Sequence, residues 1–282
     1  MNHSKSLFLY GLIMIILTGC SSLTYQQHEP RQDVEESKQY LYKEKFPLEF
    51  LPRSMEIVAV GDSLTKGVGS STDAGGYLPF LEESLMESGG FLSIQSSNFG
   101  VKGHRTDQLL KRLNEEVIIE KMKTADVIVV TIGGNDIMKV IKQNFNQLDL
   151  GDFQQAMPTF NENISSILKR IRDLNEGATV YLIGVYNPLS RLLPQITEFN
   201  TVISLWNEVS QKHIDSYSNM YFVDISHIFT EGMNVLYEED LFHPNDLGYE
   251  LIAESLYKKM IESQRMDSWG TPLISTGGEE ES

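Results

Sequence analysis

The chain has 282 residues, of which 41% are hydrophobic and 22% are charged, a balance typical of a globular protein. Its formal net charge is −16, and no cluster of lysine and arginine occurs along it. Because phosphate binding needs a basic surface, we exclude a nucleic acid as partner, and the same charge argues against electrostatic docking on anionic lipid.

The N-terminus is typical of an exported protein. Lys5 precedes an apolar run at residues 7–17 that is too short to span a bilayer and is typical of the central region of a signal peptide. The sequence Leu-Thr-Gly-Cys at 17–20 resembles a bacterial lipobox, and Cys20 is the only cysteine, so no intramolecular disulfide can form. We expect residues 1–19 to be a lipoprotein signal peptide and Cys20 to carry a lipid that anchors the protein at the extracytoplasmic face of the cell membrane. A plain signal peptide or a short anchor helix is the alternative.

The rest of the chain divides by composition into three parts. Residues 20–50 are polar and charged and predict a tether. Residues 265–282, which end in Ser-Thr-Gly-Gly-Glu-Glu-Glu-Ser, predict a disordered acidic tail. Residues 51–264 lie between them and predict one folded domain.

Short β-branched runs alternate with amphipathic segments along this domain. The predicted strands are 55–60, 93–98, 126–132, 179–185 and 220–224, and the predicted helices are 77–88, 105–121, 153–175, 197–216 and 246–262. Nearly continuous apolar strands predict a sheet that is covered on both faces, and their alternation with helices predicts that the strands are parallel. We therefore predict a three-layer α/β/α domain.

Polar or glycine-rich turns follow four of the predicted strands. They are Gly-Asp-Ser-Leu at 61–64, Asn-Phe-Gly-Val-Lys-Gly-His-Arg-Thr at 98–106, Gly-Gly-Asn-Asp at 133–136 and Asp-Leu-Phe-His-Pro-Asn at 240–245. In parallel sheets of this kind, ligands bind beyond the carboxyl ends of the strands. We therefore expect the four turns to converge on one edge of the sheet and to form a site there.

Together these turns contain the groups that acyl transfer requires. A serine hydroxyl needs a neutral imidazole to take its proton, and the imidazole needs a carboxylate to fix its tautomer. Ser63 supplies the hydroxyl, and Asp240 and His243 are three residues apart, close enough for the carboxylate to bond Nδ1. The negative charge that develops on the carbonyl oxygen needs N–H donors. The backbone of Ser63, the backbone of Gly103 and the side-chain amide of Asn135 can supply them.

The four blocks resemble, in order and in spacing, the signature of the SGNH or GDSL hydrolase family. The resemblance covers roughly residues 55–262 and implies a flavodoxin-like fold with neither metal nor cofactor. It also implies that Ser63 is the nucleophile, that His243 is the base and that Asp240 orients this histidine.

The resemblance further implies an oxyanion hole formed by the N–H groups of Ser63 and Gly103 and by the side chain of Asn135. Gly100 competes with Gly103 in the second block. We favour Gly103 because the glycine of the family lies beyond an asparagine at the strand end, which here is Asn98.

Several neighbouring residues are expected to support the site rather than to react. We expect Asp62 and Asp136 to hold their loops through hydrogen bonds to the backbone. His104 is beside Gly103 and is a candidate for the lining of the pocket, and residues 186–199 are candidates for an acyl pocket or a lid.

The sequence therefore predicts a lipid-anchored serine esterase. The motifs do not specify the ester, since acetyl groups on wall polysaccharides, lysophospholipids and acylated peptides all suit the mechanism. Two alternatives remain open: a lipoprotein that binds a wall or lipid ligand without hydrolysing it, and an acyltransferase that uses the same triad.

Overall fold

The computed structural model describes residues 53–71, 75–190, 195–230 and 234–267. The predicted signal peptide, Cys20 and the predicted tether lie outside the described residues, as does the predicted tail beyond residue 267. Within the described part of the chain, no helix is both long and apolar enough to cross a membrane.

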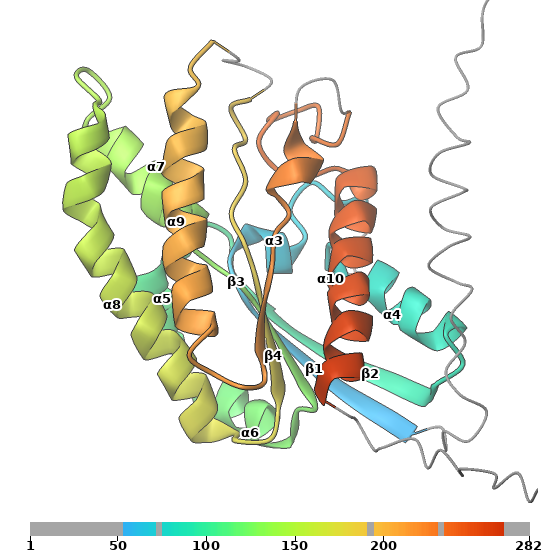
Figure 1. The fold of residues 1–282 in the computed structure, drawn as a ribbon. Coiled ribbons are helices and arrows are strands. Elements are labelled where there is room, and N and C mark those ends of the chain that lie inside the picture. The colour runs from blue at the N-terminus through green and yellow to red at the C-terminus, as the bar shows by residue number, and fades with distance from the viewer. Residues whose placement is uncertain (1–52, 72–74, 191–194, 231–233, 268–282) are drawn as a thin grey trace, which may run out of the picture. The chain divides into compact units, whose positions relative to one another are not determined.

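The described strands form one parallel sheet (Figure 1). They are β1 (Arg53–Gly61), β2 (Phe91–Gly100), β3 (Val127–Thr131), β4 (Thr179–Ile183) and β5 (Met220–Val223). Their order is β2-β1-β3-β4-β5, and every neighbouring pair is parallel. This is the flavodoxin-like order, so the predicted fold class is confirmed, and the order reverses direction between β1 and β3.

Helices cover both faces of the sheet. They are α3 (Ser63–Lys66), α4 (Leu78–Glu87), α5 (Thr106–Arg112), α6 (Glu116–Thr124), α7 (Gly134–Gln143), α8 (Leu150–Leu174), α9 (Glu198–Ile214), the 3₁₀ helix η1 (Ser226–Phe229) and α10 (Asp246–Asp267). Figure 1 shows α5, α6, α8 and α9 on one face of the sheet and α4 and α10 on the other.

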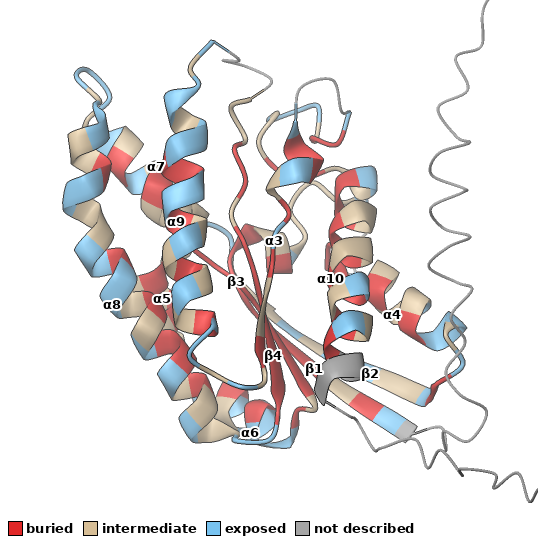
Figure 2. Ribbon diagram, viewed as in Figure 1, coloured by how far each residue is buried: buried red, intermediate tan, exposed pale blue. Residues whose placement is uncertain are grey.

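The core lies between the sheet and the helices, where β3, β4 and most of β1 are buried, whereas β2 at the edge of the sheet is largely half-buried or exposed (Figure 2). All five residues of β3 are buried, and so are all five of β4, as expected for strands covered on both faces. The largest fully buried side chain is Trp206 of α9, whose ring lies 5.3 Å from that of Phe160 on α8. The apolar periodicity that predicted α8 and α9 thus marks the faces that bury this cluster.

The helix predictions were wrong in three places. The predicted helix 105–121 is two helices, because the side chain of Asn114 donates to the carbonyls of Leu110 and Lys111 and competes with the helical backbone. Helix α7 was not predicted, since it begins in Gly-Gly-Asn-Asp, a sequence of low helix propensity. Helix α10 continues to Asp267, beyond the predicted residue 262 and into the predicted tail.

Candidate active site

Ser63 is the first residue of α3 and follows β1 directly at the carboxyl edge of the sheet. It is 4% exposed. The strand can pass into the helix here only because residue 61 is a glycine. Gly61 has φ +148°, and a Cβ on it would lie 2.1 Å from the carbonyl oxygen of Thr131 on β3. The turn therefore places Ser63 between β1 and β3, where the strand order reverses and ligands bind in this fold.

Asp62 holds this turn, as predicted. Its Oδ1 accepts hydrogen bonds from the N–H of Leu64 at 3.1 Å and from the hydroxyl of Thr131 at 3.0 Å. The hydroxyl of Thr65 joins the Thr131 hydroxyl at 2.8 Å and that of Tyr77 at 3.0 Å. The carboxyl group of Asp62 thus caps α3 and ends a buried chain of hydroxyl groups that connects β3, α3 and the segment before α4.

Asp240 and His243 form the contact that their spacing predicts. Nδ1 of His243 lies 2.6 Å from Oδ2 of Asp240, while Oδ1 accepts from the backbone N–H groups of Phe242 and His243. Partial burial alone would raise the pKa of Asp240, but these hydrogen bonds outweigh it and hold the pKa below its usual value. An ionised carboxylate at this position keeps the proton of the imidazole on Nδ1 and leaves Nε2 able to accept one.

The loop that carries His243 is fixed from both sides. Tyr186, which follows β4, donates from its hydroxyl to the carbonyl of Phe242 at 2.7 Å. The N–H of Tyr237 donates to the carbonyl of His243 at 2.8 Å. Asn245 then caps α10, since its Oδ1 accepts from the N–H of Gly248 at 3.0 Å.

Ser63 and His243 come from opposite ends of the domain and are brought close by α10. The hydroxyl of Tyr249 on α10 donates to the carbonyl of Val68 at 2.7 Å and approaches the carbonyl of Ser63 at 3.5 Å. A Cβ on Gly69, just after α3, would lie 3.3 Å from Cβ of His243. In the described residues no hydrogen bond joins the Ser63 hydroxyl to His243.

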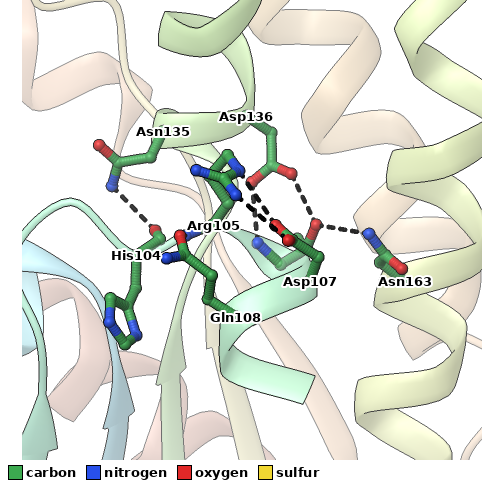
Figure 3. A network of polar contacts seen from close by, with 8 residues as sticks. His104, Arg105, Asp107, Gln108, Asn135, Asp136 and Asn163 are labelled. Atoms are coloured by element: carbon green, nitrogen blue, oxygen red, sulfur yellow. Dashed lines mark hydrogen bonds and ion pairs between the residues drawn. The ribbon is translucent and has the colours of Figure 1, made fainter. Parts of the chain in front are cut away.

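Asn135 lies in the first turn of α7 and reaches the second block. Its Nδ2 donates to the carbonyl of His104 at 3.0 Å (Figure 3). The N–H of Gly100 is already donated to Oδ1 of Asn98 at 2.9 Å, whereas the N–H of Gly103 has no acceptor in the part of the chain that the structure describes. Gly103, rather than Gly100, therefore has an N–H group available to a ligand.

Asp136 fixes the second block against α7, as predicted (Figure 3). Its carboxylate accepts from the backbone N–H of Thr106 at 3.0 Å and from the Thr106 hydroxyl at 2.6 Å. Asn163 of α8 donates to the same hydroxyl at 3.0 Å. Burial raises the pKa of Asp136 in spite of these two bonds. The network joins α5, α7 and α8 and thereby sets the distance between Gly103 and Asn135.

An apolar pocket adjoins Ser63 and Asn135. It lies between α7, the segment after β4 and α9, and residues 186–189 and Phe199 line it, in agreement with the expectation for residues 186–199. His104, which was a candidate for the lining, is not among the residues that line this pocket. Sequence reasoning missed the contribution of α7, which comes from Ile137, Met138 and Ile141. The spacing of these three at one helical turn was the available signal.

Comparison with known proteins agrees with this arrangement. Residues 59–251 match the model of the GDSL-like lipase/acylhydrolase family. The uncharacterized protein YpmR of Bacillus subtilis strain 168 is 34% identical over 248 residues, which cover 87% of this chain and 92% of that protein. The spore germination lipase LipC of Bacillus licheniformis is 30% identical over 211 residues, 72% of this chain and 95% of LipC. The solved structure of the lipase Lip_vut3 from a goat rumen metagenome is 28% identical with a TM-score of 0.65, and the match covers 72% of this chain and 96% of that one. The chain therefore belongs to the GDSL-like lipase/acylhydrolase family and is a carboxylic ester hydrolase.

Proposed function

We propose that the protein cleaves carboxylic esters through a covalent acyl-enzyme formed on Ser63. In this mechanism His243 is the general base and Asp240 orients it. The N–H groups of Ser63 and Gly103 and the amide of Asn135 form the oxyanion hole. The observation that carries the proposal is the 2.6 Å contact between Nδ1 of His243 and the carboxylate of Asp240, on a loop that packs against Gly69 just after α3.

In the first half of the reaction, the Ser63 hydroxyl attacks the ester carbonyl carbon as Nε2 of His243 takes its proton. The imidazolium that forms is stabilised by the ionised carboxylate of Asp240. The carbonyl oxygen gains negative charge and accepts hydrogen bonds from the three donors, each worth about 3 kcal/mol when preorganised. The tetrahedral intermediate then expels the alcohol, which receives the proton from His243.

In the second half, a water molecule replaces the alcohol. His243 takes a proton from this water as it attacks the acyl-enzyme, and the proton returns to the Ser63 oxygen when the acid leaves. The same three donors stabilise the second oxyanion, so one set of residues serves both steps.

The test is hydrolysis of p-nitrophenyl butanoate by the wild-type protein and by Ser63→Ala. We expect the variant to lose at least about a thousandfold in kcat while it keeps its circular dichroism spectrum and melting temperature. Ser166→Ala, an exposed serine on α8, is the matched control and should keep the wild-type rate. A Ser63→Ala protein that releases p-nitrophenol at the control rate would place the nucleophile elsewhere. Product analysis with an added sugar acceptor separates hydrolysis from acyl transfer.

We also propose that the protein is held at the extracytoplasmic face of the cell membrane by a lipid on Cys20. The support is the sequence alone: the apolar run, the Leu-Thr-Gly-Cys at 17–20 and the position of the single cysteine. Such a location would give the enzyme access to lipid and cell-wall esters.

A further inference from the structure

The pocket beside Ser63 is small and apolar. Its volume is about 50 Å³, and Ser63 and Asn135 line it together with side chains such as Ile137 and Met138 of α7 and Ile203 of α9. Ile137 and Ile203 are 4% and 6% exposed. If Ser63 attacks the ester carbonyl, the group that lies in this pocket is therefore a part of the substrate bonded directly to that carbonyl.

Other polar side chains of the lining are already engaged within the protein. Asp62 and Thr131 bond each other at 3.0 Å. Oδ1 of Asn187 accepts from the N–H of Leu189 at 2.9 Å, and its Nδ2 donates to Asn200 at 2.8 Å. Beyond Ser63 and Asn135, the pocket thus has few polar groups that could bind a sugar ring or a charged chain. Its lining suits a hydrocarbon.

The volume limits the length of that hydrocarbon. An engineered apolar cavity of about 150 Å³ holds benzene, so each carbon takes roughly 25 Å³. By the same measure, a pocket of about 50 Å³ holds about two carbons. Three half-buried side chains also line the pocket: Met138, Ile141 and Phe199. A longer hydrocarbon chain would extend past them into solvent, and its additional carbons would add little binding free energy.

We infer that this pocket binds the acyl group of the ester and that its size makes short acyl groups, propanoyl to butanoyl, the preferred substrates. The inference rests on the proposed role of Ser63 as nucleophile. An acetyl group would leave part of the pocket unfilled, and an octanoyl group would extend out of it.

The first test measures kcat/KM on p-nitrophenyl acetate, butanoate, octanoate and dodecanoate. Burial of one methylene increases binding about fourfold, and butanoate has two methylenes more than acetate, so we expect the value to rise about fifteenfold between them and not to rise further with chain length. Ile141→Trp should remove the advantage of butanoate and spare acetate. Phe199→Ala should move the optimum toward octanoate. Leu205→Ala, an exposed residue of α9 outside the lining, is the matched control and should keep the wild-type profile.

The second test needs no turnover. Ser63→Ala with labelled methionine and isoleucine methyl groups is titrated with butanoate and octanoate and followed by nuclear magnetic resonance. We expect the Met138 and Ile137 methyl signals to shift with butanoate, and Ile141→Trp to abolish the shifts.

The outcomes separate the two proposals. Hydrolysis with a flat chain-length profile, or a profile that Ile141→Trp leaves unchanged, overturns the pocket assignment and keeps the serine mechanism. If no ester is hydrolysed, the serine mechanism fails. In that case, Met138 and Ile137 methyl shifts that depend on the chain length of the added acid would still support a pocket for short acyl chains. If neither acid shifts these signals, the pocket assignment is overturned as well.

Discussion

At the scale of single residues, the carboxyl group of Asp62 combines burial with a structural role. It is 5% exposed and lies next to the proposed nucleophile. Burial raises the pKa of Asp62 to about 7, although hydrogen bonds from Leu64 and Thr131 oppose the rise and Asp136 adds to it. The same hydrogen bonds cap α3, so the position of Ser63 depends on a group that is costly to ionise.

This burial makes stability depend on pH at Asp62. In the unfolded chain an aspartate releases its proton near pH 4, whereas in the folded protein Asp62 keeps it to about pH 7. The folded state therefore binds more protons in this window, and its stability falls as the pH rises through it. Asp62→Asn keeps an oxygen for the Leu64 N–H and cannot ionise. We expect it to stabilise the protein at pH 8 by on the order of 4 kcal/mol and to lose this gain at pH 4.

Urea unfolding at both pH values measures the effect. Asp173→Asn, an exposed residue of α8, is the control and should show a much smaller difference between the two. A gain for Asp62→Asn that is equal at pH 4 and pH 8 would contradict the assignment of the raised pKa to this residue.

At the scale of elements, two glycines with different constraints lie at the end of β2 and in the turn that leads to α5. Gly100 packs against α3, and a Cβ on it would lie 2.2 Å from the backbone nitrogen of Lys66. Gly103 has φ +82°, but nothing lies within 4 Å of the position of its Cβ. The first glycine is therefore required by close packing and the second only by its backbone conformation.

The two alanine variants should differ in stability. We expect Gly100→Ala to lose about 3 kcal/mol of unfolding free energy, because backbone atoms of α3 must move. Gly103→Ala should lose about 1 kcal/mol from the strained φ. It should also stay active, since alanine keeps the N–H group. Urea unfolding measures the stability of both variants, and ester hydrolysis measures the activity of Gly103→Ala. A Gly100→Ala protein as stable as Gly103→Ala would show that α3 does not pack against Gly100 as described.

At the scale of the whole molecule, the proposed lipid anchor and the enzyme domain are independent features of one chain. We expect a radiolabelled fatty acid supplied to an expressing bacterium to label the wild-type protein and Ser63→Ala, and not Cys20→Ser. Label on Cys20→Ser would remove the basis for the anchor.

The sequence by itself determined the features that depend on local pattern. All five strands of the described sheet and their parallel arrangement followed from runs of β-branched residues between helices. The contact of Asp240 with His243 followed from their separation by three residues. Each strand follows from its local pattern of residues, and Asp240 and His243 are neighbours in the chain, so their spacing alone decides that contact.

Only the tertiary structure decided what depends on distant segments. That residue 100 must be a glycine depended on its close packing against the backbone of Lys66 in α3. The pocket depended on α7, a helix with weak propensity that packing stabilises, and on side chains of α9 far away in the sequence. Burial, volume and long-range hydrogen bonds are properties of the assembled chain, because they arise only when the sheet brings its strand ends together.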